Sequence, residues 1–242
     1  MQYCILAGTE DCRPAFPAGN QSLEAMKKQV IVAIDGPAGA GKSSVARGVA
    51  EALGFTYLDT GAMYRAVALW ALRTGIALDD LHRLEQLAKQ AQIEFVGEQI
   101  LLNGEDVTGA IREPEVSEAA SKVAACGGVR RAMREEQRRI ASNHSSVMEG
   151  RDIGTVVFPE AQVKVFLDAS PEERARRRAA ELGVKDKRTV AREMEDRDRR
   201  DRTRVEAPLT QAPDADYLDT SCLSREEVED AILKLVRKRT SN

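Results

Sequence analysis

Short apolar runs alternate along this chain with longer stretches in which apolar residues recur every three or four positions. The first convincing run covers residues 30–34, Val-Ile-Val-Ala-Ile, and contains no polar residue. A continuous run of this length is typical of a parallel strand that is covered on both faces. Four further short strands are predicted, at residues 55–58, 146–148, 163–167 and 216–218.

Helices are predicted between these strands. Residues 43–53 carry an apolar face at helical spacing, and Gly54 follows as a C-terminal cap. Cap signals such as Asp59-Thr60-Gly61 and the separator Gly127-Gly128 delimit further helices, predicted at 62–73, 117–125, 129–142, 172–182, 189–201 and 225–239. The alternation indicates an α/β fold, with a five-stranded parallel sheet and helices on both of its faces.

One segment interrupts the alternation. A short helix is predicted at about 84–92, and two candidate strands follow at 93–96 and 100–102, with Asn103-Gly104 as a hairpin turn signal. The segment 84–110 is therefore interpreted as a small β-rich insertion.

The first 25 residues show no sustained periodicity and contain Pro14 and Pro17. We interpret residues 1–25 as a disordered N-terminal tail. Met26-Lys27-Lys28, directly before the first strand, resembles a natural chain start. A chain of 242 residues is long enough for one large α/β domain with an insertion, so residues 26–242 are predicted to form a single domain.

The charge pattern argues against a nucleic-acid-binding protein. The formal net charge is -3, and charged residues make up 31% of the chain in both signs, so no global basic field exists. Residues 172–204 are locally basic, with 13 Lys and Arg against 9 Asp and Glu. This excess is suited to a small polyanion such as a nucleotide.

The four cysteines are scattered and form no C-x-x-C pair, and neither histidine is near them. This pattern gives little support to a zinc site or a disulfide framework, so a reducing cytoplasm is the expected location. No stretch approaches the length of a membrane span, and Glu10 and Asp11 lie where a signal peptide would be apolar. We expect no membrane association and a monomer.

The first strand leads into a phosphate-binding motif. Gly36-x-x-x-x-Gly41-Lys42-Ser43 has the Walker A spacing between a predicted strand and a predicted helix. Glycines let successive backbone N–H groups point at phosphate oxygens, and the helix N-terminus adds further donors. The predicted ATP-binding residues are Gly36, Pro37, Ala38, Gly39, Ala40, Gly41, Lys42, Ser43 and Ser44. Lys42 would reach the β and γ phosphates, and Ser43 would ligate Mg²⁺.

The P-loop alone does not choose among GTPases, motor ATPases and small-molecule kinases. A Ras-like GTPase would need N-K-x-D, which is absent after residue 100. An ABC or AAA ATPase would need an apolar strand that ends in adjacent acids, whereas the strand 163–167 ends in a single acid, Asp168. Arginines instead follow several strand ends, where α/β folds bind ligands. Arg199 and Arg200 fit a solvated helix face equally well. Of the four arginines between 174 and 178, one or two at most should reach a phosphate.

At these residues the chain resembles the bacterial cytidylate kinase family over nearly its whole length from Val30 onward. The matching motifs, in order, are IDGPAGAGKSS, LDTGAMYR, NGEDVTGAIR, VSEAASKVAA, EGRDIGTVVFP, KVFLDASPEERARRR and RDRRDRTRVEAPL. The resemblance implies a nucleoside-monophosphate kinase that transfers a phosphoryl group from ATP to CMP or dCMP with Mg²⁺. It also implies that 84–110 is a nucleotide-binding insertion and that 172–204 contains a short lid with its flanking helices.

The resemblance also assigns roles to individual residues. It implies that Thr60, Arg65 and Arg151 hold the CMP phosphate, that Ser121, Arg130 and Asp152 read the cytosine, that Arg197 and Asp201 hold the ribose, and that Arg204 lies near the transferring phosphate. Lys42, Arg151 and Arg204 are the predicted catalytic residues.

One position departs from the family pattern. Glu149 stands where the family commonly has Asp, which leaves the role of this residue open. Two other functions remain as alternatives at this point: a P-loop kinase of another small metabolite, such as UMP, AMP or shikimate, and a non-catalytic nucleotide- or RNA-binding module.

Overall fold

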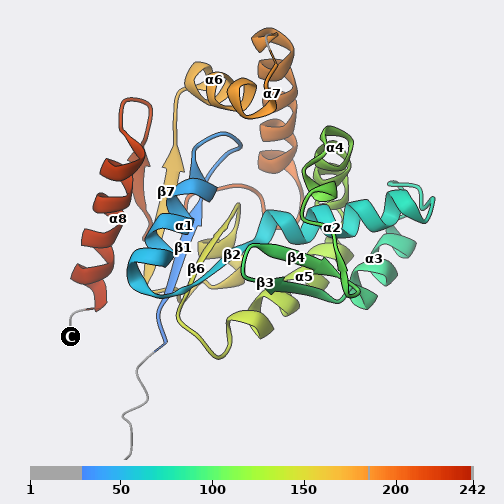
Figure 1. Ribbon diagram of the computed structural model, residues 1–242, viewed down its shortest axis with the longest axis horizontal. Coiled ribbons are helices and arrows are strands. Elements are labelled where there is room, and N and C mark those ends of the chain that lie inside the picture. The colour runs from blue at the N-terminus through green and yellow to red at the C-terminus, as the bar shows by residue number, and fades with distance from the viewer. Residues whose placement is uncertain (1–28, 185, 241–242) are drawn as a thin grey trace, which may run out of the picture.

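The main sheet has five parallel strands in the order β2-β6-β1-β7-β8 (Figure 1). The structure is a computed structural model that describes residues 29–184 and 186–240. The strands are β1 (Ile31–Asp35), β2 (Thr56–Asp59), β6 (Ser146–Gly150), β7 (Val163–Asp168) and β8 (Asp216–Asp219). The predicted α/β class and all five strands are therefore confirmed, whereas the tail predicted at 1–25 lies outside the described residues.

Helices cover both faces of this sheet. On one face, α1 (Lys42–Leu53) and α8 (Arg225–Thr240) pack over a cluster that includes Val32, Val165 and Ile232. On the other face, α2 (Thr60–Arg73) and α5 (Gly127–Ala141) lie beside β6 and a short π-helix at Ile153–Val157, which the apolar pattern did not predict. Gly150–Asp152 connects β6 to this turn, so the loop that carries Arg151 has buried structure on both sides.

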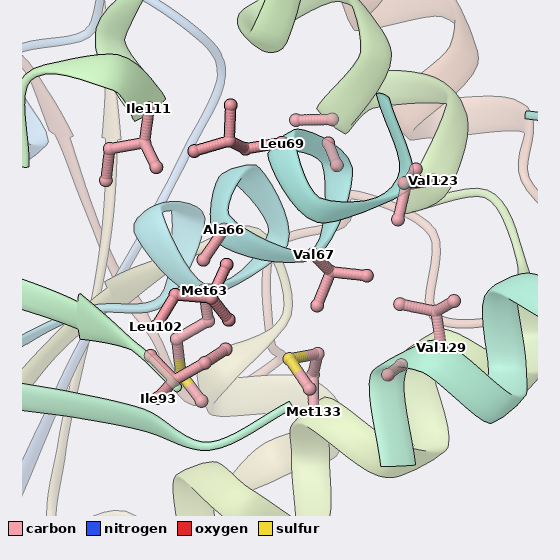
Figure 2. Close-up of a cluster of buried hydrophobic side chains, with 14 of the residues drawn as sticks. Met63, Ala66, Val67, Leu69, Ile93, Leu102, Ile111, Val123, Val129 and Met133 are labelled. Carbon is pink, nitrogen blue, oxygen red and sulfur yellow. The ribbon is translucent and has the colours of Figure 1, made fainter. Parts of the chain in front are cut away.

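The segment after α2 forms a second core. It contains α3 (Leu81–Gln90), a small antiparallel sheet of β3 (Ile93–Val96), β4 (Gln99–Leu102) and β5 (Glu105–Asp106), a 3₁₀ turn at Ala110–Arg112, and α4 (Pro114–Val123). Figure 2 shows Met63 and Val67 of α2 packed with Ile93, Leu102 and Met133. The insertion and the helices beside the main sheet thus share one apolar cluster.

The predicted strands at 93–96 and 100–102 pair as an antiparallel hairpin, β3 and β4. The turn signal at Asn103-Gly104 is confirmed as well: both residues have positive φ, 51° and 82°, and they join β4 to a third strand, β5, which was not predicted. One local prediction was wrong. Gly127-Gly128 does not separate two helices but forms the first turn of α5. A Cβ on Gly127 would lie 2.3 Å from the Glu206 side chain, and one on Gly128 would lie 2.2 Å from the Glu85 side chain. Glycine at these positions therefore leaves room for the two glutamate side chains to pack against the helix.

Two helices, α6 (Pro171–Leu182) and α7 (Lys187–Thr203), project beyond the carboxyl end of β7 (Figure 1). Ser170 caps α6 by accepting a hydrogen bond from the Glu173 amide, and Gly183 ends it with a φ of 66°. These helices were predicted at 172–182 and 189–201. Their position leaves the P-loop beneath them.

Candidate active site

The loop between β1 and α1 depends on glycine at two points. Gly36 has a φ of 151°, and a Cβ there would lie 1.9 Å from the Leu167 carbonyl oxygen of the neighbouring strand. Gly41 has a φ of 88° and is the N-cap of α1. No other residue could adopt the backbone conformation at either position without strain. The two glycines let the loop turn sharply and present its amides at the start of α1.

Lys42 is buried at the start of α1, and its Nζ donates to the Pro37 carbonyl at 2.6 Å. Burial lowers the pKa of Lys42 well below its usual range, and the nearby Arg151 cation lowers it further. An anion beside this amine would raise its pKa and so oppose both effects. The amine therefore favours a strongly negative ligand.

Glu149, whose role the sequence left open, is hydrogen-bonded to the P-loop. Ser43 Oγ donates to Glu149 Oε2 at 2.9 Å, and the Tyr57 hydroxyl donates to the other carboxylate oxygen. Burial, followed by the neighbouring Asp59 charge, raises the pKa of Glu149. A hydroxyl and a carboxylate that face each other are oxygen ligands of the kind Mg²⁺ prefers, so this donor set fits the predicted cation.

One cavity of about 490 Å³ extends from the P-loop to α4 and α5. Most of the predicted residues line it: Ala38, Gly39, Gly41, Lys42, Ser43, Ser44, Thr60, Arg65, Ser121, Arg130, Arg151, Asp152, Arg197, Asp201 and Arg204. Gly36, Pro37 and Ala40 lie in the loop without lining the cavity. The structure thus brings together segments that are far apart in the sequence.

The middle of this cavity is rich in arginine. Arg151 donates from Nε to Asp201 Oδ2 at 3.0 Å, and Arg204 lies 3.5 Å from the other oxygen of that carboxylate. Arg197 differs, because its side chain has no hydrogen bond or ion pair within residues 29–184 and 186–240 and its Nε is buried. Burial and the Arg151 cation lower the pKa of Arg197 below the usual arginine value. Arg151 and Arg204 share the single carboxylate of Asp201, and Arg197 has no partner of its own among the described residues. This excess of positive charge is suited to bind an anion.

A buried ion pair lies at the far end of the cavity. Arg130 Nη2 and Asp152 Oδ2 are 2.5 Å apart, and the two side chains are 6% and 9% exposed. The guanidinium of Arg130 lies over the ring of Tyr64, 5.4 Å from its centroid, and Arg204 lies 3.7 Å from Asp152 Oδ1. This end presents both a fixed cation and a fixed carboxylate to a ligand.

The loop that carries Arg151 and Asp152 is held by Asp35, the last residue of β1. Its two carboxylate oxygens accept hydrogen bonds from the amides of Ile153 and Gly154, at 2.8 and 2.7 Å. Burial raises the pKa of Asp35 to about 6. Sequence reasoning missed this residue, although an acid directly after five apolar residues was the available signal.

Of the four arginines in α6, two line the cavity, Arg177 and Arg178, as the limit set from the sequence allows. Arg174 instead pairs with Asp198 of α7 and donates to the Ala38 carbonyl at 3.1 Å, and Arg176 pairs with Glu173 on the surface. The cavity wall also contains residues that the sequence did not place in the site: Asp59, Gly61, Tyr64, Ala120, Ala124, Glu149, Gly150 and Glu181.

Comparisons with known proteins agree over most of the chain. A family model described as "Cytidylate kinase" matches residues 32–238. A cytidylate kinase from Solibacter usitatus is 62% identical over 222 residues, which are 89% of this chain and 96% of that protein. A cytidylate kinase from Caldanaerobacter subterraneus is 48% identical and is covered to 96% of its length.

Two further matches are less complete or more distant. A bifunctional pantoate ligase/cytidylate kinase from a Synechococcus strain is 50% identical, and this chain spans 41% of its length. The crystal structure of an uncharacterized protein from Eubacterium ventriosum has a TM-score of 0.52 at 15% identity and covers 87% of this chain and 100% of its own, a likeness of fold alone. No helix in the described part of the chain is long and apolar enough to cross a membrane.

Proposed function

The chain belongs to the cytidylate kinase family, and from this premise we propose that it transfers the γ-phosphoryl group of ATP to CMP or dCMP, releasing ADP and CDP or dCDP. One observation carries the proposal. A single cavity joins the P-loop, a cluster of incompletely paired arginines and the buried Arg130–Asp152 pair. These parts suit a phosphoryl donor, a second phosphate and a polar base, in that order along the cavity.

On the donor side, the P-loop amides and Lys42 would hold the β and γ phosphates of ATP. Ser43 and Glu149 would hold Mg²⁺, which when bound neutralises charge on the phosphates. Lys42 is held by the Pro37 carbonyl at the start of α1, so its amine needs little reorganisation to meet the transferring phosphate. Such preorganised charge stabilises the transition state more than the bound substrate.

On the acceptor side, Thr60, Arg65 and Arg151 would bind the CMP phosphate, and Arg197 and Asp201 the ribose. Arg204 would lie near the phosphoryl group during its transfer. Little covalent work is required of the protein, because phosphoryl transfer needs two anions held in line with their charge neutralised. Arginine is suited to this task since its fork donates two hydrogen bonds and stays charged.

Base recognition would fall to Ser121, Arg130 and Asp152. A carboxylate can accept a hydrogen bond from the exocyclic amine of cytosine, whereas it would face the O4 carbonyl of uracil. Arg130 holds the Asp152 carboxylate in place and would itself donate to the N3 or O2 side of the base.

We assign the lid role to α6, α7 and the loop between them. Arg177 and Arg178 would reach the ATP phosphates, and closure would exclude water that otherwise hydrolyses ATP. A monomer in the cytoplasm is part of the proposal. The cytoplasmic location rests on the four scattered cysteines, which are typical of a reducing compartment.

A substrate panel tests the proposal. With MgATP, ADP release should be fast with CMP or dCMP and slow with UMP, AMP or shikimate. The variant Lys42→Ala should lower kcat by on the order of 10³-fold, because the amine acts on the transferring phosphate. Calorimetry should show that its CMP binding is unchanged. Equal turnover of UMP, AMP or shikimate would contradict the proposal. So would salt-sensitive RNA binding without CMP binding.

A further inference from the structure

We propose that Arg200 is a positioning residue that fixes the hydroxyl of Ser121 as a hydrogen-bond donor toward the nucleotide base, and that it thereby raises the preference for cytosine over uracil. The inference rests on the proposed function. Arg200 does not line the cavity, so it would act through Ser121 and not on the substrate.

The contact joins two elements that are distant in the sequence. Arg200, in the last turn of α7, donates from Nε to Ser121 Oγ of α4 at 3.1 Å, across 79 residues. Ser121 is 5% exposed, and it lines the cavity. Arg200 therefore approaches Ser121 from the lid helix.

A serine hydroxyl has one donor and two acceptor positions, and its hydrogen rotates to suit the partner. Without a fixed neighbour, Ser121 could donate to one base or accept from another. The Arg200 cation at its oxygen favours the rotamer whose hydrogen points away from the guanidinium. Within the described residues, the Ser121 side chain has no other hydrogen bond, so its hydrogen is free to meet a ligand.

This orientation distinguishes the two pyrimidines. Cytosine has an acceptor at N3, whereas uracil has an N–H donor there, so a fixed donor on Ser121 would meet a second donor in UMP. The mismatch adds to the one expected at Asp152. A single neutral hydrogen bond of this kind changes affinity by about 2- to 10-fold.

The adjacent arginine provides a matched control. Arg199 is on the same helix, its side chain is 70% exposed, and it pairs with Asp196 at 2.6 Å. Variants of Asp152 would be less informative, because they would leave the buried guanidinium of Arg130 without its carboxylate.

The experiment compares Arg200→Gln with Arg199→Gln in the full chain. CMP and UMP affinities are measured by calorimetry without ATP, and kcat/KM is measured for both nucleotides at one salt concentration. Arg200→Gln should weaken CMP binding by about 2- to 10-fold and reduce the CMP over UMP ratio, with the KM for ATP unchanged within about twofold. Arg199→Gln should match the wild type in every measurement.

A double-mutant cycle shows whether Arg200 acts through Ser121. In a Ser121→Ala background, Arg200→Gln should add less than about twofold, because the hydroxyl it orients is gone. Arg200→Lys keeps the charge and should retain more of the selectivity than Arg200→Gln. An unchanged CMP over UMP ratio in Arg200→Gln, an equal loss in the Ser121→Ala background, or no difference between the lysine and glutamine variants would each overturn the inference. A wild-type protein that binds no CMP would overturn the proposed function as well.

Discussion

At the scale of single residues, Asp35 shows how a buried carboxylate can hold a loop. It ends β1 and accepts the amides of Ile153 and Gly154, so it fixes the loop that carries Arg151 and Asp152. Its position is set by one hydrogen bond to each oxygen. The carboxylate is surrounded by protein, and this burial has a measurable consequence for stability.

Burial raises the pKa of Asp35 to about 6, against an ordinary value of 3.8. Between pH 3.8 and pH 6, the folded protein therefore keeps a proton on Asp35 that the unfolded chain has lost. The contribution of Asp35 to stability is therefore full below pH 3.8 and is lost as the pH rises through 6. We expect the stability of the wild type relative to Asp35→Asn to fall by roughly 1 kcal/mol between about pH 5 and 7.5.

Urea denaturation of both proteins at the two pH values gives this difference directly, because subtraction removes the titrations that they share. A relative stability that stays constant or rises with pH would show that the two amides lower the pKa of Asp35 more than burial raises it.

At the scale of elements, the helices α6 and α7 are joined to each other and to the P-loop. Arg174 of α6 pairs with Asp198 of α7, and both side chains are nearly buried, at 9% and 4% exposed. Arg174 also donates to the Ala38 carbonyl, and Asp198 accepts from the Ala38 amide at 3.4 Å. The pair therefore links the position of α6 and α7 to the conformation of the P-loop.

Two arginines in α6 allow a matched test of this link. Arg174→Ala would leave Asp198 buried without its cation, and we expect it to lower the free energy of unfolding by about 3–5 kcal/mol. Arg176→Ala removes only a surface pair with Glu173 and should cost less than about 1 kcal/mol. Urea denaturation, with hydrogen exchange of the α6 and α7 amides, measures both effects. Equal losses in the two variants would contradict a structural role for the buried pair.

At the scale of the whole molecule, the insertion and the main sheet are expected to unfold together. Leu102 and Ile93 of the small sheet pack in the same cluster as Met63 of α2 and Met133 of α5 (Figure 2). The far end of α5 reaches a second cluster with Ala141, beside Ala33 and Met148 of the main sheet. The two cores are thus joined through one helix.

Leu102→Ala should lower the stability of the entire domain by about 2–5 kcal/mol in one cooperative transition, because it opens a cavity in the shared core. Val96 is in the same small sheet but is 52% exposed, and Val96→Ala should change stability by less than about 0.5 kcal/mol. Circular dichroism of the helices and fluorescence of Trp70 in α2 should follow the same urea transition in both variants. Separate transitions in Leu102→Ala would show that the insertion folds independently.

The sequence determined those features that depend on neighbouring residues. All five strands of the main sheet were predicted, and the apolar pattern explains this best for β1 and β7, which are buried along almost their whole length. The edge strands β2 and β8 are only partly buried. The glycine spacing predicted the P-loop, because Gly36 and Gly41 have positive φ angles that other residues adopt only with strain. Turn chemistry predicted the turn at Asn103-Gly104 and the strand before it, but not β5 after it, since Glu105 and Asp106 carry no apolar pattern.

Only the tertiary structure decided which side chains meet. Glu149 contacts Ser43 across 106 residues, Asp35 contacts Gly154 across 119, and Arg200 contacts Ser121 across 79. These pairs depend on the strand order β2-β6-β1-β7-β8, which brings the carboxyl ends of β1 and β6 side by side, and on the packing of α7 against α4. Local periodicity contains no information on strand order or helix docking, because both are set by the burial of whole faces, and so the partners of buried polar groups appear only when the chain is folded.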